Sequence, residues 1–290
     1  MAKVLSQKLK VALVQLAATA DKAKNLSRVK EHVLKAASNG AQLVVLPECF
    51  NSPYSVAAFP QYAESIPSGE TTTFLSSLAR ETAIYLIGGS IPERDEQGKL
   101  FNTSLSFSPT GELIAKHRKV HLFDIDIPGK IKFKESEVLT GGNKVTVFNI
   151  PPFGKVGLAI CYDIRFPELA MIAARNEGAF AMIYPGAFNT TTGPLHWELL
   201  ARARAVDNQF YVLVCSPARD LTSGYHAYGY SMVTDPNAHV LAKAGEDEEI
   251  IYAELVPGVI EEARAGIPVT AQRRFDVYTN VADSAKTSAL

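Results

Sequence analysis

The sequence lacks any long hydrophobic run and any strong charge of one sign. It contains no stretch of about 18 consecutive apolar residues, which argues against a membrane-spanning helix. The formal net charge is -1, and no basic run extends beyond the KHRK of residues 116–119, so nucleic acids and anionic membranes are not expected partners. We therefore expect the partners to be small molecules or further copies of the chain.

Cysteine is also scarce, with Cys49, Cys161 and Cys215 as the three examples. An odd, small number of cysteines predicts free thiols in a reducing compartment rather than a disulfide framework. The N-terminal MAKVLSQKLK contains lysines but no apolar segment of the kind found in secretory signals. These features predict a cytoplasmic protein, with a mitochondrial form from another start site as an open alternative.

Several ligand-binding motifs are missing as well. The sequence contains no HExxH, CxxC, GxGxxG or Walker pattern, which are motifs that hold zinc, dinucleotides or nucleoside triphosphates. We therefore expect neither a metal nor an organic cofactor.

The composition is that of a globular protein, with 47% hydrophobic and 20% charged residues in 290. Internal repeats, linkers and boundaries rich in Pro, Gly or Ser are not apparent. We expect one domain over residues 1–290, with a core spanning about residues 8–280.

Strand-like and helix-like segments alternate along most of the chain. Residues 10–18 are apolar and predict a strand, and residues 21–39 have helical spacing that ends at Gly40. Continuous apolar runs such as VGLAIC predict strands covered on both faces, whereas the alternation of NTSLSFSP predicts one wetter face. Residues 238–245 and 248–256 resemble a hairpin. The fold class is therefore α/β, an α-β-β-α arrangement with either one large mixed sheet or two packed sheets.

Cys161 lies in GLAICYDIRFPELA, where an apolar strand stops and a helix is expected to start at Pro167. Such a position lifts a side chain to the carboxyl edge of a sheet, where α/β proteins bind ligands. A free cysteine is often only a buried packing residue. Asp163 and Arg165 nearby favour a reactive thiol instead, because reactive thiols occur in electropositive surroundings at helix N-termini.

A nucleophilic thiol needs a base, and the best candidate is Glu48 in LVVLPECF, at the end of another apolar strand. Glu48 is either a solvated loop residue or a base whose pKa is raised by a strand-end pocket. Among the histidines, His196 could line a pocket, but packing beside Trp197 is the favoured interpretation. Cys49 is expected to pack away from Glu48.

Two further charged residues could take part. Lys119 in HRKVHLFD is either a surface lysine or a fixed cation that lowers the pKa of the thiol and neutralises an oxyanion. Glu135 in FKESEVL has no distinguishing feature when judged alone. Spacing alone does not show that these distant segments meet.

Three sequence blocks resemble the catalytic blocks of the nitrilase superfamily, which are carbon-nitrogen hydrolases with a Glu-Lys-Cys triad. These blocks are LPECF, HRKVHLFDIDIPG and AICYDIRFPE, separated by about 70 and 40 residues, and the similarity covers nearly the whole chain. The stretches FNSPYS, FNTTTGPLHWELLARARAVDN and SPARD further resemble the Nit-type ω-amidase branch.

The resemblance implies a role for each candidate. Cys161 would be the nucleophile, Glu48 the general base and Lys119 the oxyanion stabiliser. Glu135 would hold Lys119, and the backbone N–H of Tyr162 would complete the oxyanion hole. The family fold is an α-β-β-α sandwich, usually paired into homodimers across helices such as the one after Cys161.

The implied reaction is hydrolysis of the terminal amide of α-ketoglutaramate or α-ketosuccinamate through a cysteine thioester. Arg165 would pair with the substrate carboxylate, or would only brace the turn through Asp163 or Glu168. Thr192 and Tyr54 would line the site. The alternatives are a deaminated glutathione amidase, a carbamoylase or a nitrilase of the same superfamily, and a catalytically silent scaffold, which the complete triad disfavours.

Overall fold

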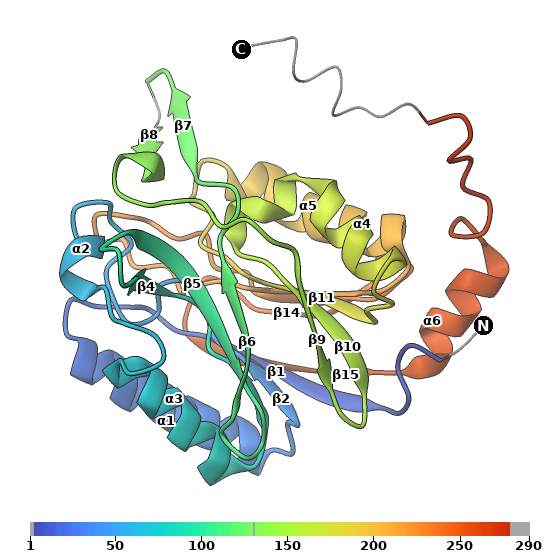
Figure 1. The fold of residues 1–290 in the computed structure, drawn as a ribbon, viewed down its shortest axis with the longest axis horizontal. Helices are drawn as coiled ribbons and strands as arrows, with labels where there is room; N and C mark the ends of the chain where they lie inside the picture. The colour runs from blue at the N-terminus through green and yellow to red at the C-terminus, as the bar shows by residue number, and fades with distance from the viewer. Residues whose placement is uncertain (1–2, 130, 279–290) are drawn as a thin grey trace.

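The computed structural model describes residues 3–129 and 131–278 and contains two packed β-sheets with helices on their outer faces (Figure 1). One sheet has seven strands in the order β15-β1-β2-β3-β5-β4, with β6 paired to β5. The other has six strands in the order β14-β13-β12-β11-β10-β9. A separate two-stranded hairpin, β7 and β8, projects from the body of the molecule (Figure 1).

The element bounds are as follows. The seven-stranded sheet contains β1 (Leu9–Gln15), β2 (Leu43–Val45), β3 (Tyr85–Ile87), β4 (Ile91–Arg94), β5 (Leu100–Phe107), β6 (Leu113–Arg118) and β15 (Glu249–Leu255). The six-stranded sheet contains β9 (Thr146–Ile150), β10 (Gly154–Leu158), β11 (Ala181–Pro185), β12 (Tyr211–Cys215), β13 (Met232–Thr234) and β14 (Val240–Lys243), and the hairpin contains β7 (Asp124–Ile127) and β8 (Ile131–Lys134). The helices are α1 (Lys22–Ser38), α2 (Phe59–Tyr62), α3 (Glu70–Thr82), α4 (Pro167–Arg175), α5 (Gly193–Asn208) and α6 (Pro257–Gly266).

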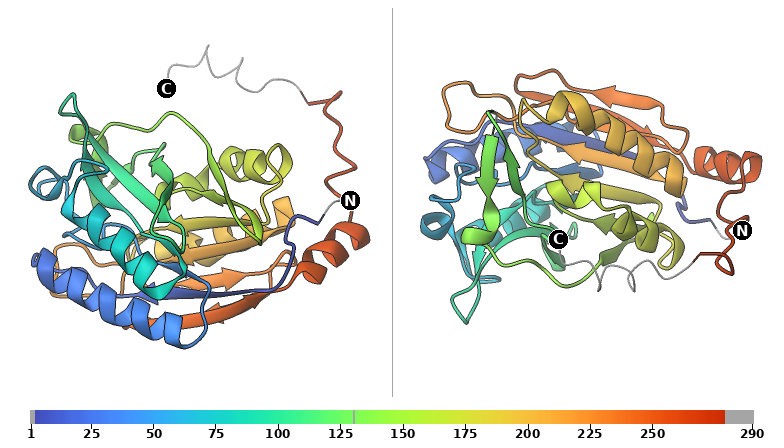
Figure 2. Two further views of the ribbon diagram at one scale, coloured as in Figure 1. Left: turned by 60° about the horizontal axis from the view of Figure 1, so that its bottom comes forward. Right: turned by 90° about the horizontal axis from the view of Figure 1, so that it is seen from above.

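The layers form the expected α-β-β-α sandwich, with two packed sheets rather than one. Helices α1 and α3 cover the outer face of the seven-stranded sheet, and α4 and α5 cover that of the six-stranded sheet (Figures 1 and 2). Apolar side chains from both sheets, including Val11, Leu13, Val156 and Ile183, fill the space between them. Their strands are apolar throughout because the opposite face of each strand packs on helices.

Helix α1 shows how local sequence sets an element. The side chain of Asp21 accepts a hydrogen bond from the Lys24 N–H at 3.0 Å and caps the N-terminus. Leu26, Val29 and Val33 recur at helical spacing and are buried against the sheet. Gly40 follows the C-cap with a φ of 80°, a conformation that glycine adopts without strain. The expected helix over residues 21–39 is confirmed.

Strand β5 differs from its expectation, because all eight of its residues are buried. Leu105 and Phe107 pack toward the helices. Ser106 is the cross-strand partner of Ile87, a residue of the core between the sheets, so the polar face of β5 points into the sandwich. The predicted wetter face is wrong, since alternation does not reveal that a second sheet covers the polar side.

The expected hairpin near the C-terminus is also wrong. Strand β14 pairs with β13 in one sheet, whereas β15 pairs with β1 in the other. The side-chain Nε2 of Gln15 donates to the carbonyls of Gly245 at 2.8 Å and Asp247 at 2.6 Å. These hydrogen bonds hold the loop that leads from β14 in one sheet to β15 in the other. Among the described residues, no helix has the length and apolarity needed to cross a bilayer.

The parallel strands determine where functional side chains meet. Strands β1, β2 and β3 run parallel in one sheet, and β10, β11 and β12 run parallel in the other. Glu48 follows β2, Cys161 follows β10 and Ala187 follows β11. The carboxyl edges of both sheets therefore contribute to one site.

Candidate active site

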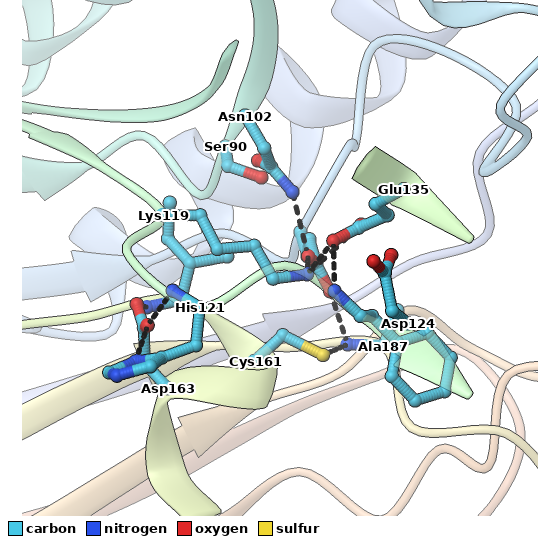
Figure 3. Close-up of polar contacts among 12 residues, drawn as sticks. Ser90, Asn102, Lys119, His121, Asp124, Glu135, Cys161, Asp163 and Ala187 are labelled. Atoms are coloured by element: carbon cyan, nitrogen blue, oxygen red, sulfur yellow. Dashed lines mark hydrogen bonds and ion pairs between the residues drawn. The ribbon is translucent and has the colours of Figure 1, made fainter. Parts of the chain in front are cut away.

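Four residues from different segments converge between the two sheets: Glu48, Lys119, Glu135 and Cys161. Figure 3 labels the last three of them. The Nζ atom of Lys119 lies 3.0 Å from Oε1 of Glu48 and 3.0 Å from Oε1 of Glu135. None of the four side chains is more than 3% exposed. Buried charges of opposite sign must pair in this way, because an isolated one is too costly to remove from water.

Glu48 is held by donors on both of its oxygens. Oε1 accepts from Asn102 Nδ2 at 2.8 Å, and Oε2 accepts from the backbone N–H of Ala187 at 2.7 Å. Burial raises the pKa of Glu48, and the ammonium of Lys119 only partly opposes this rise. The solvated-loop interpretation is wrong, and the raised pKa suits a group that takes up and returns protons.

Cys161 occupies a strained turn. Its φ is 49°, in the left-handed region that side chains with a Cβ rarely adopt, and it begins a short 3₁₀ segment, Cys161–Arg165, before α4. The Sγ atom lies 3.4 Å from the N–H of Ala187. Strain of this kind persists only where surrounding contacts enforce it. The same Ala187 N–H also donates to Glu48, so the turn places the thiol beside that carboxylate.

The protonation of the thiol differs from the expectation. Burial and the negative charge of Glu48 raise the pKa of Cys161 well above its usual value, although Lys119 acts in the opposite direction. The expected low-pKa thiol is therefore wrong. With its pKa raised, the thiol keeps its proton, so a base must remove that proton as the sulfur attacks.

Lys119 is fully buried, so the surface-lysine interpretation is wrong. Burial lowers the pKa of Lys119, but Glu135 and Glu48 outweigh burial and raise it well above its usual value. The side chain therefore remains a cation. A fixed cation beside a thiol can neutralise an oxyanion that forms on an attacked carbonyl.

Glu135 starts the 3₁₀ segment Glu135–Glu137 that follows the β7–β8 hairpin. It accepts hydrogen bonds from the Tyr54 hydroxyl at 2.8 Å and from the Phe123 N–H at 2.7 Å, in addition to Lys119. Glu135 is thus the second carboxylate that holds the ammonium. Together the four residues provide a nucleophile, a base and a cation, the set that acyl transfer requires.

A cavity of about 670 Å³ reaches Glu48 of this cluster, together with Tyr54 and Ala187, while Lys119, Glu135 and Cys161 are not among its lining residues. Its walls come from the loop at residues 217–227 and from the hairpin, whose Phe133 stacks on Tyr54 with ring centroids 5.6 Å apart. This volume is ample for a small-molecule substrate.

The three expected substrate-contacting residues are placed differently. Tyr54 lines the cavity, whereas Arg165 and Thr192 are not among its lining residues. The Thr192 hydroxyl donates to Asn189 at 3.2 Å. The guanidinium of Arg165 is hydrogen-bonded through Nη1 to Nδ1 of His196, at 3.1 Å.

The expected brace from Arg165 to Asp163 or Glu168 is wrong. Neither carboxylate lies within 4 Å of its guanidinium, and the described residues provide Arg165 with no ion pair. His196 contacts this arginine instead of serving mainly as a packing residue beside Trp197. Of the other two cysteines, Cys49 packs against Phe59, Leu100 and Leu139, as predicted.

Other contributors have no recognisable sequence pattern. Asn102 and Ala187 contact Glu48, and the Tyr225 hydroxyl donates to the Ala187 carbonyl. Asn102 lies on the polar face of β5, which is the only feature that could have pointed to it. Tyr162 packs its ring near Phe123 and Phe166. In the described part of the chain, no group of three or more His, Cys, Asp or Glu side chains is arranged to hold a metal ion.

Comparisons with known proteins give one consistent result. A family model described as carbon-nitrogen hydrolase matches residues 10–265. The ω-amidase NIT3 of Saccharomyces cerevisiae is 59% identical, covering 96% of this chain and 98% of its own, and the ω-amidase NIT2 of Mus musculus is 55% identical, covering 93% and 96%. Among solved structures, S. cerevisiae Nit3, a member of branch 10 of the nitrilase superfamily, has a TM-score of 0.87 at 55% identity, covering 94% of this chain and 99% of that one.

Proposed function

This chain belongs to the carbon-nitrogen hydrolase family and is an amidase, and we propose that it is an ω-amidase acting on α-ketoglutaramate and α-ketosuccinamate. Relatives named ω-amidase that are 53–59% identical over most of the chain support this activity. The observation that best supports the catalytic role of the site is the Lys119 ammonium, 3.0 Å from both Glu48 and Glu135 and buried beside Cys161.

In the first half of the reaction, Glu48 takes the proton from Cys161 while Sγ attacks the carbonyl carbon of the amide. Lys119 and the backbone N–H of Tyr162 stabilise the resulting oxyanion. Glu48 then passes its proton to the amide nitrogen, the carbon-nitrogen bond breaks, and ammonia leaves. The product on the enzyme is a thioester.

In the second half, Glu48 takes a proton from water, and the hydroxide attacks the thioester. The carbon-sulfur bond breaks, the proton returns from Glu48 to the sulfur, and the dicarboxylic acid leaves. Glu135 keeps the ammonium in place throughout, because it accepts from Lys119 at 3.0 Å without reaching the thiol. Glu48 is the group that must change protonation state, which suits its raised pKa.

Ammonia release from four substrates tests the activity: α-ketoglutaramate, deaminated glutathione, a nitrile and a carbamoyl-amine, measured side by side. We expect the highest kcat/KM for α-ketoglutaramate. A higher kcat/KM for deaminated glutathione would contradict the ω-amidase proposal and identify the chain as a deaminated glutathione amidase. Turnover of none of the four would support a silent scaffold.

We propose that Arg165 binds the carboxylate at the far end of the substrate, although Arg165 and Thr192 lie outside the lining of the cavity and only Tyr54 lies within it. Arg165 is half-buried, and its guanidinium lies over the rings of Phe188 at 4.8 Å and Tyr162 at 5.5 Å. Burial and the neighbouring Arg165 lower the pKa of His196, so the imidazole is a neutral acceptor. A half-buried cation whose hydrogen-bond partner is neutral suits an anionic ligand.

We expect Arg165→Met to lose about 30- to 1000-fold in kcat/KM for α-ketoglutaramate, or about 2 to 4 kcal/mol, because a buried carboxylate would be left unpaired. A neutral amide of similar length should lose far less. The matched control is Lys132→Met, since Lys132 lines the cavity but is exposed and paired with Asp126 at 2.9 Å. Equal losses for charged and neutral amides would contradict the role of Arg165.

We also propose a homodimer. The helix after Cys161 is α4, which has no exposed large apolar side chain among the described residues, so we place the interface across α5 instead. This helix exposes Leu195, Leu199 and Val206 along one side, with relative exposures of 63%, 63% and 47%. Exposed apolar stripes of this kind mark packing surfaces. Sedimentation equilibrium should give twice the 31.4 kDa chain mass, and a monomer at all concentrations would contradict the proposal.

We propose that residues 1–290 form one domain and that the protein is cytoplasmic. The family match over residues 10–265 supports the first proposal. The three cysteines are free and buried, which supports a reducing compartment. Limited proteolysis that separates two stable halves would contradict the single domain.

Co-fractionation of the protein with a secretory marker would contradict the cytoplasmic location.

A further inference from the structure

A buried carboxylate, Asp163, links the turn that contains Cys161 to the segment that contains Lys119 (Figure 3). Asp163 is fully buried, and both of its oxygens are used. Oδ2 accepts from the Ile160 N–H at 3.0 Å and from Nε2 of His117 at 3.2 Å. Oδ1 accepts from the backbone N–H of His121 at 2.9 Å and from its Nδ1 at 2.8 Å.

His117 lies two residues before Lys119 in the sequence, and His121 lies two residues after it. A carboxylate can only accept hydrogen bonds, so each ring places an N–H on Asp163. Nδ1 of His117 is hydrogen-bonded to the Thr146 hydroxyl, at 2.9 Å. Burial alone would raise the pKa of Asp163, but these hydrogen bonds from His117 and His121 outweigh it and hold the pKa well below its usual range.

These contacts connect the two sheets. Lys119 follows β6 of the seven-stranded sheet, and its N–H donates to the Asn102 carbonyl of β5 at 2.8 Å. Cys161 follows β10 of the six-stranded sheet. The distance between the ammonium and the thiol therefore depends on how the two sheets are placed relative to each other. Asp163 accepts hydrogen bonds from both segments, the one that contains Cys161 and the one that contains Lys119.

We propose that Asp163, acting through His117 and His121, is a positioning residue that holds Cys161 in register with Lys119. This inference rests on the proposed function of the Glu-Lys-Cys cluster. Asp163 does not contact the thiol or the ammonium in the structure, and none of the three residues lines the cavity. Their effect should therefore appear in the chemical step rather than in substrate binding.

Two pairs of variants separate the hydrogen bonds from simple packing. His117 contacts Asp163 through Nε2, and the side-chain amide of a glutamine can place an N–H at the same position. His121 contacts Asp163 through Nδ1, and the shorter side chain of an asparagine can place an N–H there. We expect His117→Leu and His121→Leu each to lose about 100-fold in kcat, since small displacements of reacting groups cost that much, with KM within about threefold of wild type. His117→Gln and His121→Asn should recover kcat to within about tenfold.

His121→Leu keeps the test usable if His117→Leu does not fold, because the His121 side chain is 28% exposed. The matched control is His239→Leu. Nδ1 of His239 contacts Asp235 at 3.0 Å, a histidine-aspartate pair of the same kind whose members do not line the cavity. This control should keep wild-type kcat.

Alkylation of Cys161 by iodoacetamide across a range of pH provides a readout that needs no substrate. Glu48 raises the pKa of the thiol and Lys119 lowers it, so loss of register with Lys119 should move the alkylation profile to higher pH. A role in stability alone would lower the folded fraction and leave this profile unchanged. Failure of the wild type to hydrolyse any amide would refute the proposed function, while the alkylation shift would still test the position of Lys119.

The proposal is overturned by wild-type kcat in both leucine variants. It is equally overturned if their losses match the unfolded fraction measured by circular dichroism and the alkylation profile stays in place.

Discussion

Replacement of Cys161 by alanine is expected to abolish amide hydrolysis, with kcat falling by at least about 10⁴-fold while the fold remains intact. We expect no substitute nucleophile. Cys215 donates to the Val14 and Val45 carbonyls. Cys49 lines the cavity, but its side chain packs with an apolar cluster and its Sγ contacts the Ser90 hydroxyl. Loss of one small side chain typically costs about 1 to 2 kcal/mol of stability. Ammonia release and thermal unfolding measure the two effects.

The other two cysteines are the controls. Cys49→Ala and Cys215→Ala should each keep activity within about tenfold, because only packing is lost. Trapping of the acyl-enzyme with substrate, followed by peptide mass mapping, should place the added mass on Cys161. A substrate-dependent adduct on Cys49 or Cys215 would overturn the assignment of the nucleophile.

Lys119→Arg is expected to be nearly inactive, with a loss of at least about 10³-fold in kcat, although the positive charge is kept. The ammonium is fully buried, and Nζ lies 3.0 Å from one oxygen of each flanking glutamate. A planar guanidinium is larger, so it must displace Glu48, Glu135 or the thiol. Stopped-flow measurement of thioester formation should show that the acylation step is lost.

Lys116→Arg is a matched control for this substitution. Lys116 lies three residues earlier and pairs with Glu93 at 3.1 Å, but its side chain is 35% exposed and can accommodate the change. It should keep wild-type turnover and stability. Wild-type turnover in Lys119→Arg would show that diffuse positive charge is sufficient and that the compact ammonium has no special role.

The sequence by itself determined the local elements and the identities of the candidate residues. Asp21, the helical spacing after it and Gly40 set the bounds of α1, because capping and periodicity act within a few residues. Continuous apolar runs indicated the doubly covered strands for the same local reason. The three blocks around Glu48, Lys119 and Cys161 indicated the family through their order and separation.

The tertiary structure alone decided how these parts meet. The polar face of β5 is buried and β14 and β15 belong to different sheets, since pairing depends on partners far away in the chain. It also decided the electrostatics. Burial raises the pKa of Cys161 despite the nearby cation, and Arg165 has a neutral histidine as its neighbour instead of a carboxylate. A pKa depends on solvent exclusion and on charges within a few ångströms, and both are set only when distant segments pack together.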